Sequence, residues 1–217
     1  PRAVLKVIKE INPDRIFHMA SQSFVSPSWD HPLVYMDANY KITVNLLNAC
    51  LDVGINPKIL IPGSGEEFGD VNEKDLPITE SSELNPVNPY AVTKVAQDMI
   101  GFVYFKSYGL NIIRTRAFNH EGPRRDKLFG IPWYAYQIAM IEKGLQNKKM
   151  EVGHLDDKRN FTHVVDMVEA YWIATEKCNP GELYLVGSED EKDVKTFREA
   201  LECMISKSRI SGIEFEI

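Results

Sequence analysis

Short apolar runs of strand character alternate with longer stretches of helical period along most of the chain. The expected strands lie at residues 15–20, 58–63, 111–118 and 183–186, and the expected helices at residues 3–11, 38–53, 90–108, 131–143, 164–177 and 194–206. Alternating segments of this size are typical of a parallel sheet with helices on both faces. The sequence therefore predicts an α/β fold with a doubly wound parallel sheet, whose functional loops follow the carboxyl ends of the strands.

Composition and charge narrow the class of protein. The chain has 217 residues, of which 44% are hydrophobic and 26% charged, and this balance is typical of a globular chain. Its net charge is −6 and it has no basic run, which argues against a nucleic-acid partner. Three dispersed cysteines without a C-x-x-C indicate a reducing compartment, and no His, Cys, Asp or Glu set has metal-ligand spacing. We expect a soluble cytoplasmic protein without a metal or a membrane partner, because no apolar stretch is long enough to span a bilayer.

The clearest chemical motif is Tyr90 with Lys94, in the expected helix at residues 90–108. Residues four apart lie on one face of a helix, so the phenol and the ammonium can point into one cleft. A nearby ammonium lowers the pKa of a tyrosine, as a proton donor to a carbonyl oxygen at neutral pH requires. By itself, this spacing also occurs on many surface helix turns.

Ser64 follows the expected strand at residues 58–63 and opens a glycine-rich turn. A hydroxyl at the end of a strand can hydrogen-bond the substrate oxygen that a tyrosine protonates. The alternative is that Ser64 only caps the turn. The predicted architecture places Ser64 and Tyr90 at the same edge of the sheet.

Five segments, in their order along the chain, resemble the extended short-chain dehydrogenase/reductase family, in its nucleotide-sugar branch. They are His18-Met19-Ala20-Ser21, Ser64…Phe68-Gly69, Tyr90…Lys94, Arg114…Asn119…Gly122-Pro123, and Arg159-Asn160-Phe161-Thr162-His163-Val164…Asp166. Residues 118–125 and 152–159 most resemble enzymes that act on GDP-mannose and its derivatives. The resemblance implies a partial dinucleotide-binding (Rossmann) lobe with the catalytic motif at residues 1–120. It also implies a substrate-binding lobe at residues 121–217, with residues 160–177 returning to the first lobe.

The resemblance also implies a role for each residue of the site. The catalytic set is Ser64, Tyr90 and Lys94, and Glu66 stands at the place of the family's dehydratase base. The cofactor, NADP or NAD, would contact Ala20, Ser21, Tyr90, Lys94, Phe118 and His120, and the substrate would contact Asn119, Arg124, Arg125 and Arg159. Arginines can grip a diphosphate bidentately, although a salt-bridged surface pair is the alternative for this cluster.

The phosphate-binding turn of a dinucleotide-binding fold does not occur in the sequence. There is no G-x-x-G-x-x-G, and no expected strand precedes Ala3. In such folds the first β–turn–helix holds the pyrophosphate. We therefore expect the chain to be part of a longer protein, and to bind cofactor poorly or not at all without the first βα units. The residue that selects NAD or NADP is expected in those units.

Two reactions of this branch stay open. A reductase would transfer hydride to C4 of GDP-4-keto-6-deoxy-D-mannose to give GDP-D-rhamnose, and it needs only the tyrosine, serine and lysine. A GDP-mannose 4,6-dehydratase would use Glu66 as base, together with a neighbouring side chain that supports loss of water, and here that neighbour is Gly65. Residues 94–98 and 159–162 also favour the reductase, whereas residues 121–125 favour the dehydratase. A non-catalytic GDP-sugar-binding regulator is a third interpretation.

The expected helices at residues 38–53 and 90–108 carry more apolar residues than one face of a sheet requires. Pairing them across a two-fold axis would bury this excess in a four-helix interface, as the resemblance also implies. We therefore expect a homodimer.

Overall fold

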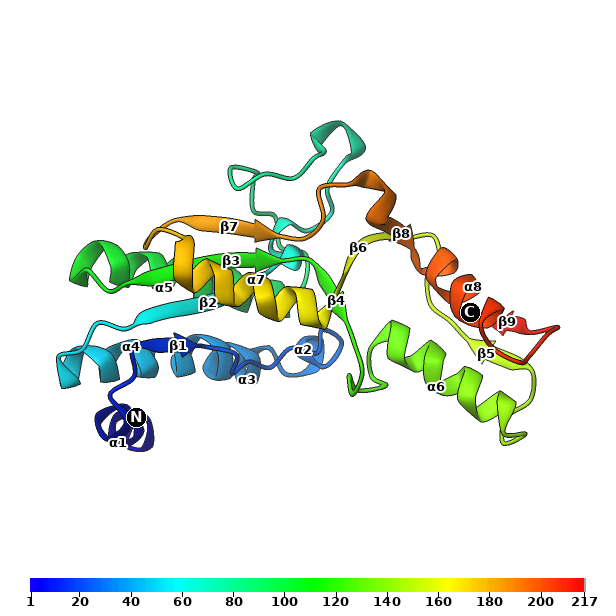
Figure 1. Ribbon diagram of the computed structural model, residues 1–217, viewed down its shortest axis with the longest axis horizontal. Coiled ribbons are helices and arrows are strands. Elements are labelled where there is room, and N and C mark those ends of the chain that lie inside the picture. Colours follow the sequence, from blue (N-terminus) through cyan, green and yellow to red (C-terminus); the bar gives the residue numbers. More distant parts are fainter. Residues whose placement is uncertain (217) are drawn as a thin grey trace. The chain divides into compact units, whose positions relative to one another are not determined.

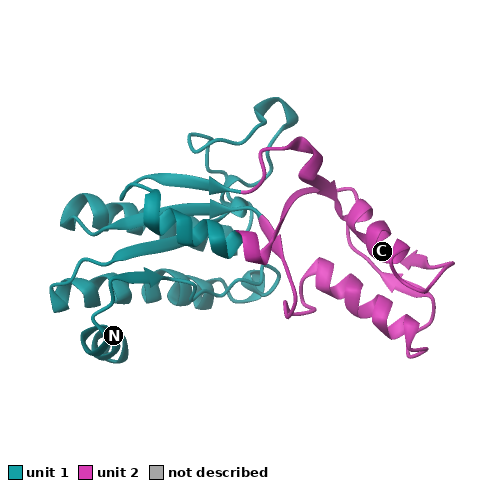
Figure 2. Cartoon of the chain, viewed as in Figure 1, with its two compact units in different colours: residues 1–118, 167–186 teal, residues 119–166, 187–217 magenta. Residues whose placement is uncertain are grey.

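The computed structural model describes residues 1–216, which form two compact units (Figures 1 and 2). Unit 1 consists of Pro1–Phe118 and Met167–Val186, and unit 2 consists of Asn119–Asp166 and Gly187–Ile217. Each unit has its own hydrophobic core.

A parallel sheet of four strands, in the order β1-β2-β3-β7, forms the centre of unit 1 (Figure 1). Its strands are β1 (Arg15–Phe17), β2 (Lys58–Ser64), β3 (Ile112–Ala117) and β7 (Leu183–Val186). The predicted α/β fold with a parallel sheet is therefore confirmed. Strand β2 pairs with β3 so that Ser64 lies opposite Ala117, which brings the ends of the two strands level.

Helices connect these strands in unit 1. They are α1 (Arg2–Ile11), α2 (Pro27–Asp30), α3 (Pro32–Met36), the π-helical turn η1 (Asp37–Lys41), α4 (Ile42–Val53), α5 (Pro89–Tyr108) and the larger part of α7 (Val164–Lys177). The helix predicted at residues 38–53 is longer than expected, because α3, η1 and α4 follow one another without a break. Gly54 and Gly109, which have positive φ angles of 75° and 69°, end α4 and α5.

The two faces of the sheet in unit 1 carry separate cores. Ile59, Ile61 and Ile112 pack with Leu46, Leu47, Cys50 and Tyr104 from α4 and α5. Leu60 and Ile113, which point the other way because strand side chains alternate, pack with Met167, Tyr171 and Ala174 of α7. Helices therefore cover both faces of the sheet. The ends of its strands are left as the place where a ligand can reach it.

Unit 2 is built on short strands and two helices. Strand β4 (Asn119–Glu121) pairs with β6 (Lys158–His163), β6 pairs with β8 (Val194–Thr196), and β5 (Lys149–Glu151) pairs with β9 (Glu214–Glu216). Helices α6 (Gly130–Glu142) and α8 (Phe197–Ser206) enclose a core around Met150, Leu155 and Leu201.

The helix predicted at residues 194–206 is wrong in its first turn. Val194–Thr196 is strand β8, and the helix begins at Phe197. Thr196 and Glu199 form a capping box: Glu199 N donates to Thr196 Oγ1 (3.0 Å) and Thr196 N donates to Glu199 Oε2 (2.7 Å). This box fixes the start of the helix.

Within residues 1–216, no helix has the length and apolar character needed to cross a membrane.

Candidate active site

The turn after β2 fixes Ser64. Ser64 caps the 3₁₀ helix η2 (Gly65–Phe68): its Oγ accepts a hydrogen bond from Glu66 N (3.2 Å), and its own N donates to Glu67 Oε1 (2.8 Å). The capping role that the sequence offered as an alternative is therefore present. Among residues 1–216 the Ser64 hydroxyl donates no hydrogen bond, so capping is compatible with donation to a substrate oxygen.

Tyr90 lies in the first turn of α5 and is only 8% exposed. Its backbone N donates to Ser28 Oγ (3.2 Å), and Asn88 caps the helix by accepting from Ala91 N (2.8 Å). The same Asn88 donates from Nδ2 to Glu66 Oε2 (2.9 Å). Asn88, which the sequence analysis did not single out, therefore ties Glu66 to the start of the helix that carries Tyr90.

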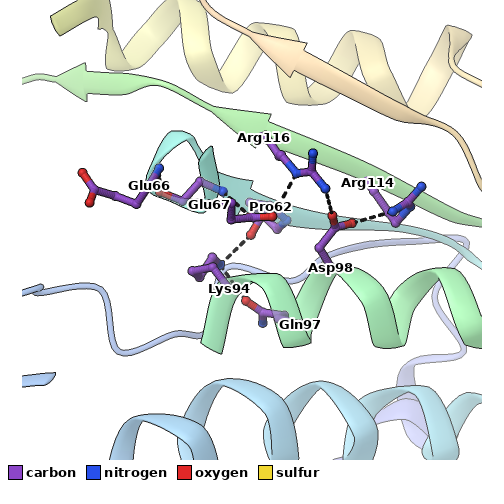
Figure 3. A network of polar contacts seen from close by, with 9 residues as sticks. Pro62, Glu66, Glu67, Lys94, Gln97, Asp98, Arg114 and Arg116 are labelled. Atoms are coloured by element: carbon purple, nitrogen blue, oxygen red, sulfur yellow. Dashed lines mark hydrogen bonds and ion pairs between the residues drawn. The ribbon is translucent and has the colours of Figure 1, made fainter. Parts of the chain in front are cut away.

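Lys94 lies one turn after Tyr90 and is 4% exposed. Its Nζ donates to Pro62 O (2.6 Å) and to Gln97 Oε1 (2.6 Å), as Figure 3 shows. Burial lowers the pKa of Lys94 to about 8, and the charges of Glu67 and Asp98 act against that decrease. An ammonium has three N–H donors, and the two contacts within residues 1–216 leave a third for a ribose hydroxyl of a dinucleotide.

A buried network of ion pairs lies behind the Ser64 turn (Figure 3). Arg116 donates from Nε to Glu67 Oε2 (2.9 Å) and from Nη2 to Asp98 Oδ2 (2.6 Å). Arg114 Nη1 donates to Asp98 Oδ1 (2.9 Å). The side chains of these four residues are at most 9% exposed.

The sequence analysis did not predict this network, although the spacing of two arginines in the chain indicates it. Arg114 and Arg116 are two apart in an apolar strand, so both point to one buried face and require carboxylates there.

The loop after β1, which holds the predicted cofactor contacts Ala20 and Ser21, is anchored by the buried Asn39. Asn39 Oδ1 accepts from Ser21 Oγ (3.0 Å) and from Gln22 N (2.7 Å). Its Nδ2 donates to Gln22 O (3.1 Å) and to Thr93 Oγ1 (2.8 Å). The loop is thereby tied to α5, and Ala20 is left exposed.

His18 belongs to the same buried polar region. Its Nε2 lies 2.8 Å from Thr43 Oγ1, which also accepts from Gln97 Nε2 (2.8 Å). Burial, and then the charge of Lys94, lower the pKa of His18 from 6.5 to about 4.

Acidification is expected to destabilise the protein through His18. A group with a lowered pKa contributes stability that is present above pH 6.5 and is lost as the pH falls through about 4. At 1.36 kcal/mol per pKa unit, the loss is at most roughly 3 kcal/mol. Glu67 acts in the opposite direction: burial raises its pKa from 4.5 to about 7, so its contribution is lost as the pH rises.

The measurement is urea unfolding of the wild type and of His18→Gln at about pH 7 and about pH 4.5, an interval over which most of the His18 contribution is lost. The variant should lose less stability than the wild type over this interval, since Glu67 is common to both. Equal losses would show that His18 is not the group responsible.

Unit 2 contains the residues that the resemblance assigns to the substrate. A cavity of about 440 Å³ is lined by Arg124, Arg125, Glu121 and His163, among others. Arg125 Nη1 donates to Glu121 Oε1 (2.7 Å), and its guanidinium lies 4.0 Å from the centre of the Phe129 ring. Arg124 has a φ of +75°, which is unusual for a residue other than glycine. The structure thus brings Arg124 and Arg125 to one cavity.

Arg159 is not among the residues that line this cavity. Its Nη2 lies 3.6 Å from Asp157 Oδ2, and its guanidinium lies 5.7 Å from the centre of the Phe197 ring. Asn119 and His120 lie in β4, opposite Phe161 and Thr162 of β6. The sequence left open whether these arginines are salt-bridged instead of free to bind a diphosphate. Arg159 is paired with Asp157, and Arg125 is paired with Glu121.

No three His, Cys, Asp or Glu side chains of residues 1–216 are grouped as metal ligands would be.

Comparison with known proteins gives a consistent family. The family described as GDP-mannose 4,6 dehydratase matches residues 1–213. The chain is 34% identical over 205 residues to the GDP-6-deoxy-D-mannose reductase of Pseudomonas aeruginosa, covering 94% of this chain and 66% of that protein. It is 29% identical over 215 residues to the GDP-mannose 4,6-dehydratase of Yersinia enterocolitica, covering 98% of this chain and 55% of that protein. The chain therefore spans less than two thirds of these curated relatives.

Solved structures share the fold. The structure of RMD from Pseudomonas aeruginosa complexed with NADPH matches with a TM-score of 0.89 and 32% identity, covering 94% of this chain and 68% of that chain. The UDP-glucose 4-epimerase of Thermus thermophilus in complex with NAD matches with a TM-score of 0.85 and 26% identity, covering 99% of this chain and 68% of that chain. Both of these structures contain a nicotinamide dinucleotide.

Proposed function

The chain belongs to the extended short-chain dehydrogenase/reductase family, in the branch of GDP-mannose dehydratases and GDP-6-deoxy-D-mannose reductases, and on this premise we propose that it acts as a reductase. The proposed reaction converts GDP-4-keto-6-deoxy-D-mannose to GDP-D-rhamnose. A bound NADPH or NADH supplies the hydride for C4. Tyr90 gives its phenolic proton to the C4 oxygen, and Ser64 orients that oxygen by a hydrogen bond. Lys94 stabilises the resulting phenolate and holds the nicotinamide ribose with its third N–H.

The observation that carries this proposal is the lack of room for a side chain at position 65. A Cβ built on Gly65 would lie 2.9 Å from Cδ1 and 3.3 Å from Cε1 of Phe118. The resemblance implies that a dehydratase carries a side chain at this position to support the loss of water. Because the Phe118 ring fills that space, the site favours proton transfer to a carbonyl, which needs no such group.

Gly65→Ser is expected to lower the free energy of unfolding by about 1–3 kcal/mol, since the new side chain overlaps Phe118. Urea unfolding measures the change, and Phe118→Leu in the same chain should recover part of it. The matched control is Gly153→Ala, where an added Cβ has no neighbour within 4 Å and the change should stay within about 0.5 kcal/mol. A Gly65→Ser variant as stable as the control would remove the steric argument for the reductase.

A dehydratase is the second candidate, and the hydrogen bond between Asn88 and Glu66 favours it. The carboxylate is half-buried and is held at the start of the helix that carries Tyr90. A base that removes the C5 proton of a sugar must be oriented in this way.

The two candidates differ in whether they consume the cofactor. The full-length protein is mixed with GDP-4-keto-6-deoxy-D-mannose and NADPH, and the loss of reduced nicotinamide absorbance is followed. Rapid loss supports the reductase. No loss, together with conversion of GDP-mannose in a separate incubation to a product one water lighter, supports the dehydratase. Tight GDP-sugar binding without turnover in either incubation supports a regulator.

We also propose that the protein is a homodimer through α4 and α5. Both helices and the adjoining π-helical turn expose large apolar side chains: Tyr40, Ile42, Val92, Met99, Val103 and Tyr108. A second copy that packs on these side chains would remove them from water. Light scattering on the full-length protein tests the proposal, and a mass of one chain would contradict it.

A further inference from the structure

Glu67 connects three elements of unit 1 from a fully buried position. It lies in η2, and its carboxylate accepts from Ser64 N at the end of β2 and from Arg116 Nε in β3. Arg116 continues the connection to Asp98 in α5, one turn beyond Lys94 (Figure 3). We propose that Glu67 is a positioning residue, which fixes the Ser64 turn and keeps Lys94 protonated. This inference rests on the proposed roles of Ser64 and Lys94.

Glu67 and Lys94 together fix the geometry of the Ser64 turn. Glu67 Oε1 lies against Gly63: a Cβ built there would overlap this oxygen and would be 2.6 Å from Thr115 O. Lys94 holds the neighbouring Pro62 by its carbonyl oxygen. Pro62 and Ser64, two residues apart at the end of β2, are thus held by Lys94 and Glu67 respectively, and a shorter side chain at position 67 would release Ser64.

The charge of Glu67 also acts on Lys94. The buried cluster contains two carboxylates, Glu67 and Asp98, and three cations, Lys94, Arg114 and Arg116. Arginine does not lose its proton in proteins. Lys94 is therefore the cation of this cluster that loses its proton more readily when negative charge is removed.

The groups that act on Lys94 have opposing effects. Burial lowers the pKa of Lys94 to about 8, whereas Glu67 and Asp98 raise it. Burial, followed by the charge of Asp98, raises the pKa of Glu67 to about 7, and Arg116, Ser64 N and Lys94 oppose that increase. His18, which faces the same ammonium from the loop after β1, stays neutral at physiological pH because its pKa is lowered to about 4. Loss of the Glu67 charge therefore leaves Asp98 as the remaining carboxylate that supports the Lys94 ammonium.

The test measures binding of NADPH to the full-length protein as a function of pH, by fluorescence, without sugar substrate. In the wild type, affinity should fall as Lys94 loses its proton. In Glu67→Gln this alkaline fall should move to lower pH by about one pH unit or more, the size of shift that a neighbouring charge produces. At a pH between the two transitions, the variant should bind NADPH roughly 10-fold more weakly than the wild type. The matched control is Asp70→Asn, which removes an exposed carboxylate three residues further along the chain, and it should leave the transition where it is.

Glu67→Asp separates the two parts of the inference. It keeps the charge but shortens the reach, so the pH transition should stay in place. The kcat for the keto-sugar should nevertheless fall about 10-fold or more, through misplacement of Ser64. If Glu67→Gln does not fold, Glu67→Gln with Arg116→Met removes both members of the buried pair. Because the two charges removed are opposite, the alkaline fall should move less than one caused by loss of the carboxylate alone, while kcat should still fall through release of Ser64. An unchanged kcat in this double variant would contradict the positioning role.

An unchanged transition in a folded Glu67→Gln variant would overturn the inference, because a merely structural carboxylate would lower affinity equally at every pH. If the wild type binds NADPH but does not reduce the keto-sugar, the proposed reaction fails while the binding curve still decides the role of Glu67. A wild type whose NADPH affinity has no alkaline fall would overturn the roles of both Lys94 and Glu67.

Discussion

Replacing Tyr90 by phenylalanine is expected to lower the turnover of GDP-4-keto-6-deoxy-D-mannose by about 10²–10⁴-fold, the usual contribution of general acid catalysis. The substitution removes one hydroxyl and keeps the ring that is buried at the start of α5. The contacts that begin this helix, from Tyr90 N to Ser28 Oγ and from Ala91 N to Asn88 Oδ1, do not involve the phenol. The loss should therefore lie in kcat, with the substrate KM within a few-fold of the wild type.

Tyr108→Phe is the matched control for this experiment. Tyr108 lies at the other end of the same helix, and Tyr108→Phe keeps its ring, so the loss of its hydroxyl should leave turnover unchanged. Steady-state kinetics of the full-length protein, followed by nicotinamide absorbance, compare the two variants. Turnover within a few-fold of wild type in Tyr90→Phe would mean that the proton comes from another group.

Replacing Asp98 by asparagine is expected to destabilise the protein by about 3–5 kcal/mol, the usual cost of breaking a buried ion pair from one side. Asp98 is 1% exposed and accepts from both Arg114 and Arg116. The neutral amide leaves Arg116 with Glu67 as its carboxylate partner, and it leaves Arg114 with a backbone contact to Gly181 O but no ion pair among residues 1–216. Since domains of this kind are stable by about 5–15 kcal/mol, the variant would lose a large part of its stability.

Urea unfolding at neutral pH measures this loss, and Asp37→Asn is the control. Asp37 pairs with Lys41 at 3.4 Å on an exposed surface, and such pairs contribute about 0–1 kcal/mol. An Asp98→Asn variant that loses no more than this control would show that the buried arginines are solvated or compensated in another way.

Most of the sheet in unit 1 follows from local sequence patterns. The predictions for α7 and β7 agree with the structure at both ends, because a helical period and an apolar run are bounded there by polar turns. The start of α8 was also accessible, since Thr196 and Glu199 have the spacing of a capping box. The short strands of unit 2 could not be predicted in this way. Strands β4 and β6 pair residues about 40 positions apart, and a strand of three residues, such as β4, is too short to have a recognisable periodicity.

The candidate site, like the fold, has features that the sequence predicts and features that it does not. The turn at Ser64 and the position of Tyr90 at the start of α5 follow from the chain order. The partners of Lys94 do not, because Pro62 O is a backbone atom, to which no sequence motif points. Asn88 contacts Glu66, and Glu67 contacts Arg116, and in both cases the partners are distant in sequence. The sequence signal for the second contact is the pair of arginines in β3, which requires buried carboxylates nearby.

The close approach of Glu67 to Gly63 ties the evolution of two positions together. Any side chain at position 63 would collide with the carboxylate below it and with Thr115 O, while loss of the carboxylate leaves a space and an unpaired arginine. A substitution at either position alone is therefore expected to lower the stability of the protein. Among relatives, the residues at these two places are therefore expected to covary, with glycine accompanying the long carboxylate and larger residues appearing only where an apolar side chain has replaced it.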